Sequence, residues 1–196
     1  MFKPLRLIVV AVGLGVLATA CVKTEVTTYE RVSGTAVDAA YLKPGTDFSR
    51  YSRLYAYPME IYFPDGAQID DGDIERIRDI FHDAFLTAIG DDFPVVDKPA
   101  EDALGVRASL VDMQTSQTPS DLPQSLALLV KSGQLTFLME LTDSKSGEVL
   151  ARAADQEKAY QDPASAEIMH EGMEQAAERW ATIFRGFLDR NLTKQN

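Results

Sequence analysis

The sequence predicts an α+β fold in which a mainly antiparallel sheet of four to five strands packs against two amphipathic helices. Two long segments repeat apolar residues at helical spacing, one before the middle of the chain and one at its end. Short segments rich in β-branched and aromatic residues lie before and between them. The resulting order, β-α-β-β-β-β-α with hairpin connections, favours two helices on one sheet.

The first 20 residues are expected to be a secretory signal peptide. Lys3 and Arg6 form a short basic region, and an uncharged, largely apolar run of 14 residues extends from Leu7 to Ala20. A bilayer core requires about 20 apolar residues, so a permanent transmembrane helix is the weaker alternative. The string Leu17-Ala18-Thr19-Ala20-Cys21 resembles the lipobox of bacterial lipoproteins, in which the cysteine receives lipid before cleavage ahead of it. An ordinary cleaved signal with an incidental cysteine is the alternative.

Cys21 is therefore predicted to be the lipid-bearing N-terminus of the mature protein. It is the only cysteine, so it cannot form an internal disulfide, and a free thiol would be a liability in an oxidising compartment. Several acyl chains would give firm membrane attachment. Val22 follows, and no aspartate stands where enterobacteria use one for inner-membrane retention. We expect the periplasmic face of the outer membrane, with the inner membrane as the alternative.

The mature chain is expected to be one domain on a tether. Residues 21–40 are polar and small and read as a flexible spacer, and residues 41–196 read as a single domain. The chain holds 19 basic and 30 acidic residues, and the signal contains two of the basic ones, which leaves a net charge near −13. Without a cluster of Lys and Arg, this acidic chain is not expected to bind nucleic acid or anionic headgroups.

The first elements of the domain are a broken strand and a helix. Residues 51–63 are rich in aromatic and β-branched types, and Pro58 within them indicates an edge position or a bulge. A helix is predicted from the N-cap Asp70, with Asp73 three residues on, to the stop at Gly90. Its apolar stripe comprises Ile74, Ile77, Phe81, Ala84, Phe85, Ala88 and Ile89.

Four strands and a long helix are expected in the second half. A short strand is predicted at 93–97, a longer one at 105–114, and a hairpin of 134–142 with 148–160. The last helix begins at Asp162-Pro163, an N-cap followed by a proline in the first position. Its stripe comprises Met169, Met173, Ala176, Trp180, Ile183, Phe184, Phe187 and Leu188.

The segment 119–131 is a long loop that carries an apolar run. Long ordered loops are often functional, and exposed apolar patches mark interaction sites. The run is predicted either to cap the open end of the core or to dock a protein partner. The residues of this docking patch would be Leu126, Leu128, Leu129 and Val130.

No residue pattern predicts a metal or cofactor site. His82 and His170 lie on different predicted helices, with no cysteine available as a further ligand, so zinc is not expected. Four aspartates crowd into nine residues, but their spacing differs from that of a calcium loop and two of them serve a helix start. They are Asp65, Asp70, Asp71 and Asp73.

The sequence also predicts no enzyme. It contains no Gly-x-Ser-x-Gly elbow, no His-Glu-x-x-His and no phosphate-binding glycine loop. Glu101 and Asp102 could in principle serve glycoside hydrolysis, but adjacent acids beside Pro99 more often mark a solvated loop.

A series of short motifs runs from residue 41 to residue 150, within a resemblance that spans about residues 41 to 190. They are Tyr41-Leu42-Lys43-Pro44-Gly45, Asp47-Phe48-Ser49-Arg50-Tyr51 with the aromatic strand up to Phe63, Phe93-Pro94-Val95-Val96-Asp97, Leu110-Val111-Asp112, Leu141-Thr142-Asp143 and Ser146-Gly147-Glu148-Val149-Leu150. In this order they resemble a family of bacterial lipoproteins, domain of unknown function 3313. The resemblance implies lipoprotein status and the fold, and it transfers no site residues because the family has no established activity.

These expectations lead to a non-enzymatic envelope lipoprotein that binds a protein partner and needs no cofactor. The alternative is a binding module for a small molecule or lipid, with a pocket between the long helix and the sheet. Trp180, Phe184 and Phe187 would line this pocket, although their helical spacing is equally that of core residues.

Overall fold

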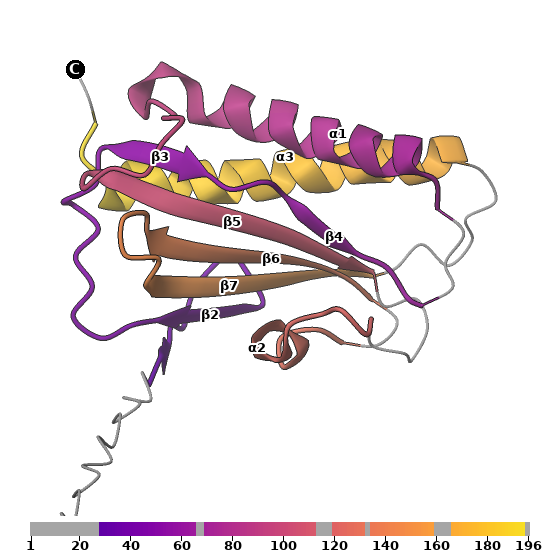
Figure 1. Ribbon diagram of the computed structural model, residues 1–196, viewed down its shortest axis with the longest axis horizontal. Helices are drawn as coiled ribbons and strands as arrows, with labels where there is room; N and C mark the ends of the chain where they lie inside the picture. The colour runs from indigo at the N-terminus through magenta and orange to yellow at the C-terminus, as the bar shows by residue number, and fades with distance from the viewer. Residues whose placement is uncertain (1–27, 66–68, 113–118, 132–133, 159–165, 195–196) are drawn as a thin grey trace, which may run out of the picture.

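Within the described residues, the fold is a seven-stranded mixed sheet with two long helices on one face and a short helix on the other (Figure 1). The computed structural model describes residues 28–65, 69–112, 119–131, 134–158 and 166–194. The strand order is β1-β2-β7-β6-β5-β3, and β4 also pairs with β5. The elements are β1 (Glu30–Arg31), β2 (Ala39–Leu42), β3 (Arg53–Ala56), β4 (Glu60–Tyr62), α1 (Asp71–Ile89), the 3-10 turn η1 (Gly90–Asp92), β5 (Ala103–Asp112), α2 (Gln124–Ala127), β6 (Gln134–Asp143), β7 (Val149–Lys158) and α3 (Ala166–Asn191).

The predicted α+β class is confirmed, but the strand count and the mainly antiparallel sheet need correction. The sheet has seven strands in the described residues rather than four or five, and both β3 and β4 run parallel to β5. The reason is that α1 carries the chain back across one face of the sheet, so β5 starts in the same direction as β3 and β4. The break at Pro58 is as predicted, since β3 ends before it and β4 begins after it.

The helix α1 begins and ends where the sequence indicates. The Asp70 side chain accepts a hydrogen bond of 2.8 Å from the Asp73 backbone N–H, which satisfies one of the free donors of the first turn. Gly90 ends the helix with φ +60°, a conformation that favours glycine. The predicted strand at 93–97 was wrong, because this segment makes only a single parallel bridge, between Val95 and Leu54, at the sheet edge.

The predicted tether over residues 21–40 is too long. Residues 30–31 and 39–42 form β1 and β2, and β2 pairs with the edge of β7 from Ala39↔Ala154 to Leu42↔Ala151. Without this pairing the β7 edge would expose its backbone donors and acceptors. Strands of two and four residues are too short to show a periodicity in the sequence, so the sequence predicts a spacer there. Residues 21–27 lie outside the described residues.

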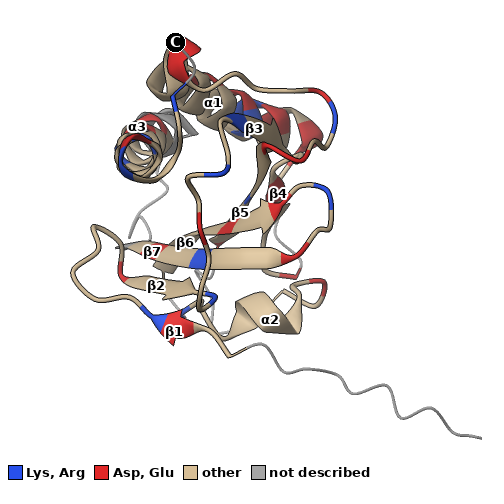
Figure 2. Cartoon of the chain, turned by 90° about the vertical axis from the view of Figure 1, so that its left-hand side faces the viewer, with Lys and Arg blue, Asp and Glu red and all other residues tan. Residues whose placement is uncertain are grey.

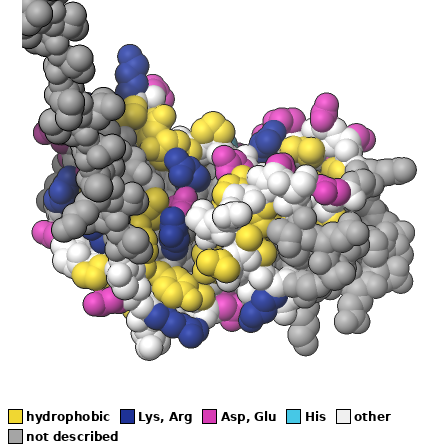
Figure 3. All heavy atoms as spheres, turned by 60° about the horizontal axis from the view of Figure 1, so that its bottom comes forward, with side chains coloured by type: hydrophobic (Ala, Val, Ile, Leu, Met, Phe, Trp, Pro, Cys, Tyr) yellow, Lys and Arg dark blue, Asp and Glu magenta, His cyan; other side chains and the backbone are white. Residues whose placement is uncertain are grey.

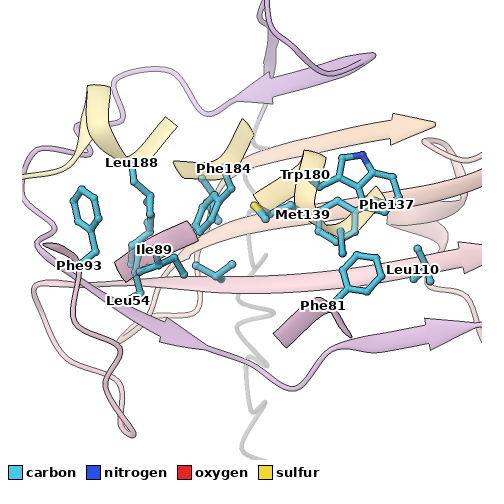
Figure 4. Close-up of a cluster of buried hydrophobic side chains, with 14 of the residues drawn as sticks. Leu54, Phe81, Ile89, Phe93, Leu110, Phe137, Met139, Trp180, Phe184 and Leu188 are labelled. Carbon is cyan, nitrogen blue, oxygen red and sulfur yellow. The ribbon is translucent and has the colours of Figure 1, made fainter. Parts of the chain in front are cut away.

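Two hydrophobic clusters occupy the two faces of the sheet, and an end view shows the three layers (Figure 2). The larger cluster lies between the sheet and the helices α1 and α3, where Phe137 stacks on Trp180 with ring centroids 4.6 Å apart (Figure 4). Phe81 from α1 stacks on Phe137 at 5.6 Å. The smaller cluster lies beneath α2 and includes Leu126 and Leu138. The sheet is therefore covered on both faces, which is why β5 and β6 read as nearly continuous apolar runs.

No helix among the described residues is long and apolar enough to cross a membrane.

Candidate functional site

An apolar groove of about 840 Å³ lies between α3 and the N-terminal strand segment. One wall is formed by α3, from Trp180 to Asn191, and the opposite wall by residues 32–37 and 46–49. Residues of β6, β7 and β2 form the floor. Small-molecule sites in proteins have volumes of about 300–1,000 Å³, so the groove has room for a ligand.

The groove exists because the two helices do not extend over the edge of the sheet at β2. The helix α3 packs beside α1 (Figure 2). The floor beyond α3 is built from Ala40, Ala151 and Ala153. On α3 itself, Gly186 lines the wall and contributes no side chain to it. Small residues at these positions leave the space that larger apolar side chains would fill, and close packing of protein interiors makes such a space unusual.

One end of the groove is held together by a buried carboxylate. Asp155 on β7 is 5% exposed and accepts a hydrogen bond of 2.6 Å from the indole N–H of Trp180. The same carboxylate lies 2.7 Å from the guanidinium of Arg179 and accepts a bond of 3.2 Å from the backbone N–H of Asp38. It therefore joins the sheet to α3 and to the segment before β2.

The other end lies at the C-terminal turn of α3. Phe48 packs edge-on against Phe187, with ring centroids 5.1 Å apart. The hydroxyl of Thr193 donates to the carbonyl of Ser49 at 2.7 Å, which ties the end of the chain to the same wall. Arg190 also lines this end and is exposed. The groove thus runs from a buried carboxylate to an exposed guanidinium.

A network of ion pairs holds α3 against the end of α1 beside the groove. Arg185 pairs with Asp92 and with Asp189, and Lys194 pairs with both acids as well. The hydrogen bonds from Arg185 and then from Lys194 lower the pKa of Asp189 to about 2 and the pKa of Asp92 below its usual value. Arg185 also donates to the carbonyl of Ala88 at 3.3 Å, and so caps α1.

The three aromatic residues proposed for a pocket on the long helix do come together at the groove. Trp180, Phe184 and Phe187 all line it, on one side of α3. Trp180 and Phe184 are also buried in the larger core cluster, at 2% and 4% exposure. Both expectations from the sequence, pocket and core, therefore describe the same side chains.

The proposed docking patch is split by the structure. Leu126 is 4% exposed and belongs to the cluster beneath α2, so it cannot offer surface to a partner, which corrects its assignment to the patch. Leu128 is 88% exposed. Leu129 and Val130 are partly buried and pack against the same cluster as Leu126. The run therefore caps one face of the core and leaves Leu128 as its exposed member.

The histidine and aspartate residues that the sequence analysis considered as metal ligands do not come together in the described part of the chain. His82 is exposed on α1, and the side chain of His170 lies outside the described residues. Asp70 caps α1, and Asp65 accepts from the hydroxyl of Ser120 at 3.2 Å. Among the described residues, no three His, Cys, Asp or Glu side chains converge on a point that could hold a metal ion.

The adjacent acids Glu101 and Asp102 differ in their contacts. Asp102 forms a two-bond ion pair with Arg53, whose hydrogen bonds lower the pKa of Asp102. Glu101 is exposed. Asp102 is thus engaged in linking β3 to the start of β5.

The open face of the sheet beside α2 mixes both charges with hydrophobic side chains (Figure 3). Here Glu140, which is 7% exposed, accepts from Arg107 at 3.2 Å and from Arg152 at 2.7 Å. Arg107 also lies over the ring of Tyr57, 4.7 Å from its centroid, and Arg152 lies over Tyr29. This network joins β5, β6 and β7, and it pairs both arginines with one carboxylate.

Sequence reasoning missed the floor of the groove and both of its polar ends. Ala151 and Ala153 look like ordinary strand residues, and a sequence signal for the α3 wall is the glycine at 186 within an otherwise good helix. Asp155 could have been singled out because period-two alternation in the strand places it on the same face as these alanines.

Comparison with known proteins gives one family match and several remote structural likenesses. A PelC dodecamer from Paraburkholderia phytofirmans has a TM-score of 0.40 and 10% identity, covering 81% of this chain and 96% of that one. A DUF4136 family protein from Bacteroides thetaiotaomicron has a TM-score of 0.41 and 10% identity, covering 79% and 97%. A DUF330 family protein from Xanthomonas campestris has a TM-score of 0.36 and 14% identity, covering 75% and 92%. No curated protein matches the sequence.

The family model described as protein of unknown function DUF3313 matches residues 26–184, which include β1, β2 and most of α3. The ordered motifs between residues 41 and 150 and the match over most of the chain agree, and the chain belongs to the DUF3313 family.

Proposed function

We propose that this protein is a lipid-anchored lipoprotein of the bacterial envelope that acts as a non-enzymatic binding module, with an apolar ligand in the groove between α3 and β2. The observation that carries this proposal is the groove itself, which has a volume of about 840 Å³ and a floor of alanines. Its aromatic wall offers apolar contact to a chain-like molecule.

The anchor follows from the sequence. The basic and apolar start of the chain and the string ending in Cys21 favour lipidation there, and the outer membrane is the expected site. Residue 28 lies seven positions after Cys21, and an extended chain spans at most about 3.5 Å per residue. Residue 28 would then lie within about 25 Å of the membrane surface, which keeps the domain close to the membrane.

The sequence lacks the catalytic motifs named above, and this supports a binding role over catalysis. The buried carboxylate at the groove is engaged in structural contacts, since Asp155 accepts from Trp180 and pairs with Arg179. A general base would need a side chain within hydrogen-bond reach of a substrate proton, and a nucleophile would need such a base beside it.

The test is to fill the groove and ask whether a bound molecule is lost. Ala153→Phe adds a ring at the floor, and Ala56→Phe makes the same change at an exposed position on β3, at the other edge of the sheet. Each protein would be purified from envelopes in native form, and bound molecules would be extracted and identified by mass spectrometry. We expect an apolar molecule with the unchanged protein and with Ala56→Phe, and a loss of at least tenfold with Ala153→Phe.

An empty extract from the unchanged protein would contradict the proposal, and so would equal recovery from the two variants. Circular dichroism of each variant would establish that the fold is kept.

A protein partner remains the second candidate, because Leu128 is 88% exposed and lies next to the partly buried Leu129 and Val130, which together would offer an apolar contact. Leu128→Asp should leave the fold intact and remove crosslinks to an envelope protein. Unchanged crosslinks, or none from the original protein, would dismiss this candidate.

A further inference from the structure

Arg190 lies at the open end of the groove with no acidic partner in the described part of the chain. It is exposed, and it is the basic residue in the last turn of α3. A guanidinium in this place offers several donors to a ligand that enters the groove.

The other charged side chains near Arg190 already have partners within the protein. Arg185 and Lys194 share the carboxylates of Asp92 and Asp189. Asp47 lines the same end of the groove, but its carboxylate accepts from the backbone N–H of Ser49 at 2.9 Å and from its hydroxyl at 2.7 Å. None of these carboxylates is paired with Arg190 in the described part of the chain, so its guanidinium is available to the carboxylate of a ligand.

Gly186 explains how this guanidinium reaches the groove. A Cβ atom placed on Gly186 would lie 3.3 Å from Nη1 of Arg190, so the guanidinium lies back along α3 over the glycine. Both residues line the groove. A larger residue at this position would push the guanidinium outward.

We propose that the groove binds a single-chain anionic amphiphile of the fatty-acid type, with its carboxylate on Arg190 and its acyl chain along the alanine floor towards Trp180. This inference rests on the proposed binding function. A guanidinium binds a carboxylate through two parallel hydrogen bonds, which fixes the position of the head. At the opposite end of the groove the carboxylate of Asp155 already accepts from Trp180 and pairs with Arg179, so that end offers no free donor to the head, and this sets the direction of the chain.

The net negative charge of the protein does not conflict with this ligand. Binding of polyanions and anionic surfaces needs many clustered cations, whereas one carboxylate needs one guanidinium whose charge is not used elsewhere.

The test uses Trp180, the only tryptophan in the chain, as a reporter inside the groove. The full lipidated protein would be placed in phosphatidylcholine nanodiscs and titrated with dibromostearic acid or with its methyl ester, since bromine quenches indole fluorescence at contact. Three variants would be compared: Arg190→Gln, Arg76→Gln on the exposed side of α1 as the matched loss of charge, and Ala153→Phe.

We expect the acid to quench Trp180 at about tenfold lower concentration than the ester, which corresponds to one charge-assisted hydrogen-bonded pair. Arg190→Gln should remove this difference by weakening the acid alone, Arg76→Gln should change nothing, and Ala153→Phe should abolish quenching by both probes. Equal quenching by acid and ester in the unchanged protein would overturn the anionic preference and leave groove binding standing. Quenching by neither probe, as expected if a second copy, a peptide or the protein's own acyl chains filled the groove, would overturn this inference as well.

Discussion

Replacement of Asp155 by alanine tests whether one buried carboxylate holds the groove together. The substitution leaves the indole N–H of Trp180 without its acceptor in a site where the tryptophan is 2% exposed. A buried donor left unpaired costs about 1–3 kcal/mol. The bond from the backbone N–H of Asp38 adds about 0.5–1 kcal/mol, and the pair with the half-exposed Arg179 adds at most about 1 kcal/mol.

The free energy of unfolding should therefore fall by about 3 kcal/mol in the Asp155→Ala variant. Urea unfolding followed by the fluorescence of the single tryptophan measures it directly, because Trp180 stacks on Phe137 only in the folded state. Asp155→Asn keeps an acceptor of the same shape and should lose only about half as much. A loss below about 1 kcal/mol for the alanine variant would refute the reasoning, since it would mean that water satisfies Trp180 and that the carboxylate links nothing.

Three further outcomes follow from single contacts. Gly105→Ala should lower the free energy of unfolding by about 2 kcal/mol, because the new methyl would collide with the hydroxyl of Thr142 on the neighbouring strand β6. Adding Thr142→Ala should recover most of the lost stability in chemical unfolding. No recovery would exclude that contact as the cause. Gly186→Ala should raise the free energy of unfolding by up to about 1 kcal/mol, because only the flexible end of an arginine lies near the methyl; a loss of stability would contradict this. Burial first, and the hydrogen bond to Asp143 second, raise the pKa of Tyr51 to about 12. Its contribution to stability is complete below pH 10 and is lost as the pH rises towards 12. Burial first, and the hydrogen bond to Glu60 second, also raise the pKa of Tyr62. Ultraviolet titration should therefore show two late tyrosinates, of which Tyr51→Phe removes one, and an unchanged titration of that variant would count against the assignment.

Much of the fold could be predicted from the sequence where local chemistry sets the outcome. The start of α1 at Asp70 and its end at Gly90 follow from capping and backbone conformation, which act within a few residues. The hairpin of β6 and β7 follows from two apolar runs around a turn that contains Gly147, whose φ of +73° favours glycine. Pro58 divided the edge strand for an equally local reason.

The parts that could not be predicted depend on distant partners. The short strands β1 and β2 exist because the edge of β7, more than 100 residues later, offers them hydrogen bonds. The parallel direction of β3 depends on how α1 crosses the sheet. Leu126 and Leu128 are neighbours of the same chemical type, yet one is buried and the other exposed, because only the turn of α2 decides which one faces the sheet.

The sequence by itself determined the class of fold, the main helices and hairpin, the family and the expected lipidation site at Cys21. Each of these follows from short motifs or local patterns of residues along the chain. Only the tertiary structure decided that a groove exists and which residues border it. Its floor, wall and two charged ends come from β2, β7 and α3, and β2 lies more than 100 residues before the other two elements along the chain. A cavity is space that packing leaves unfilled, and no local pattern of residues encodes that space.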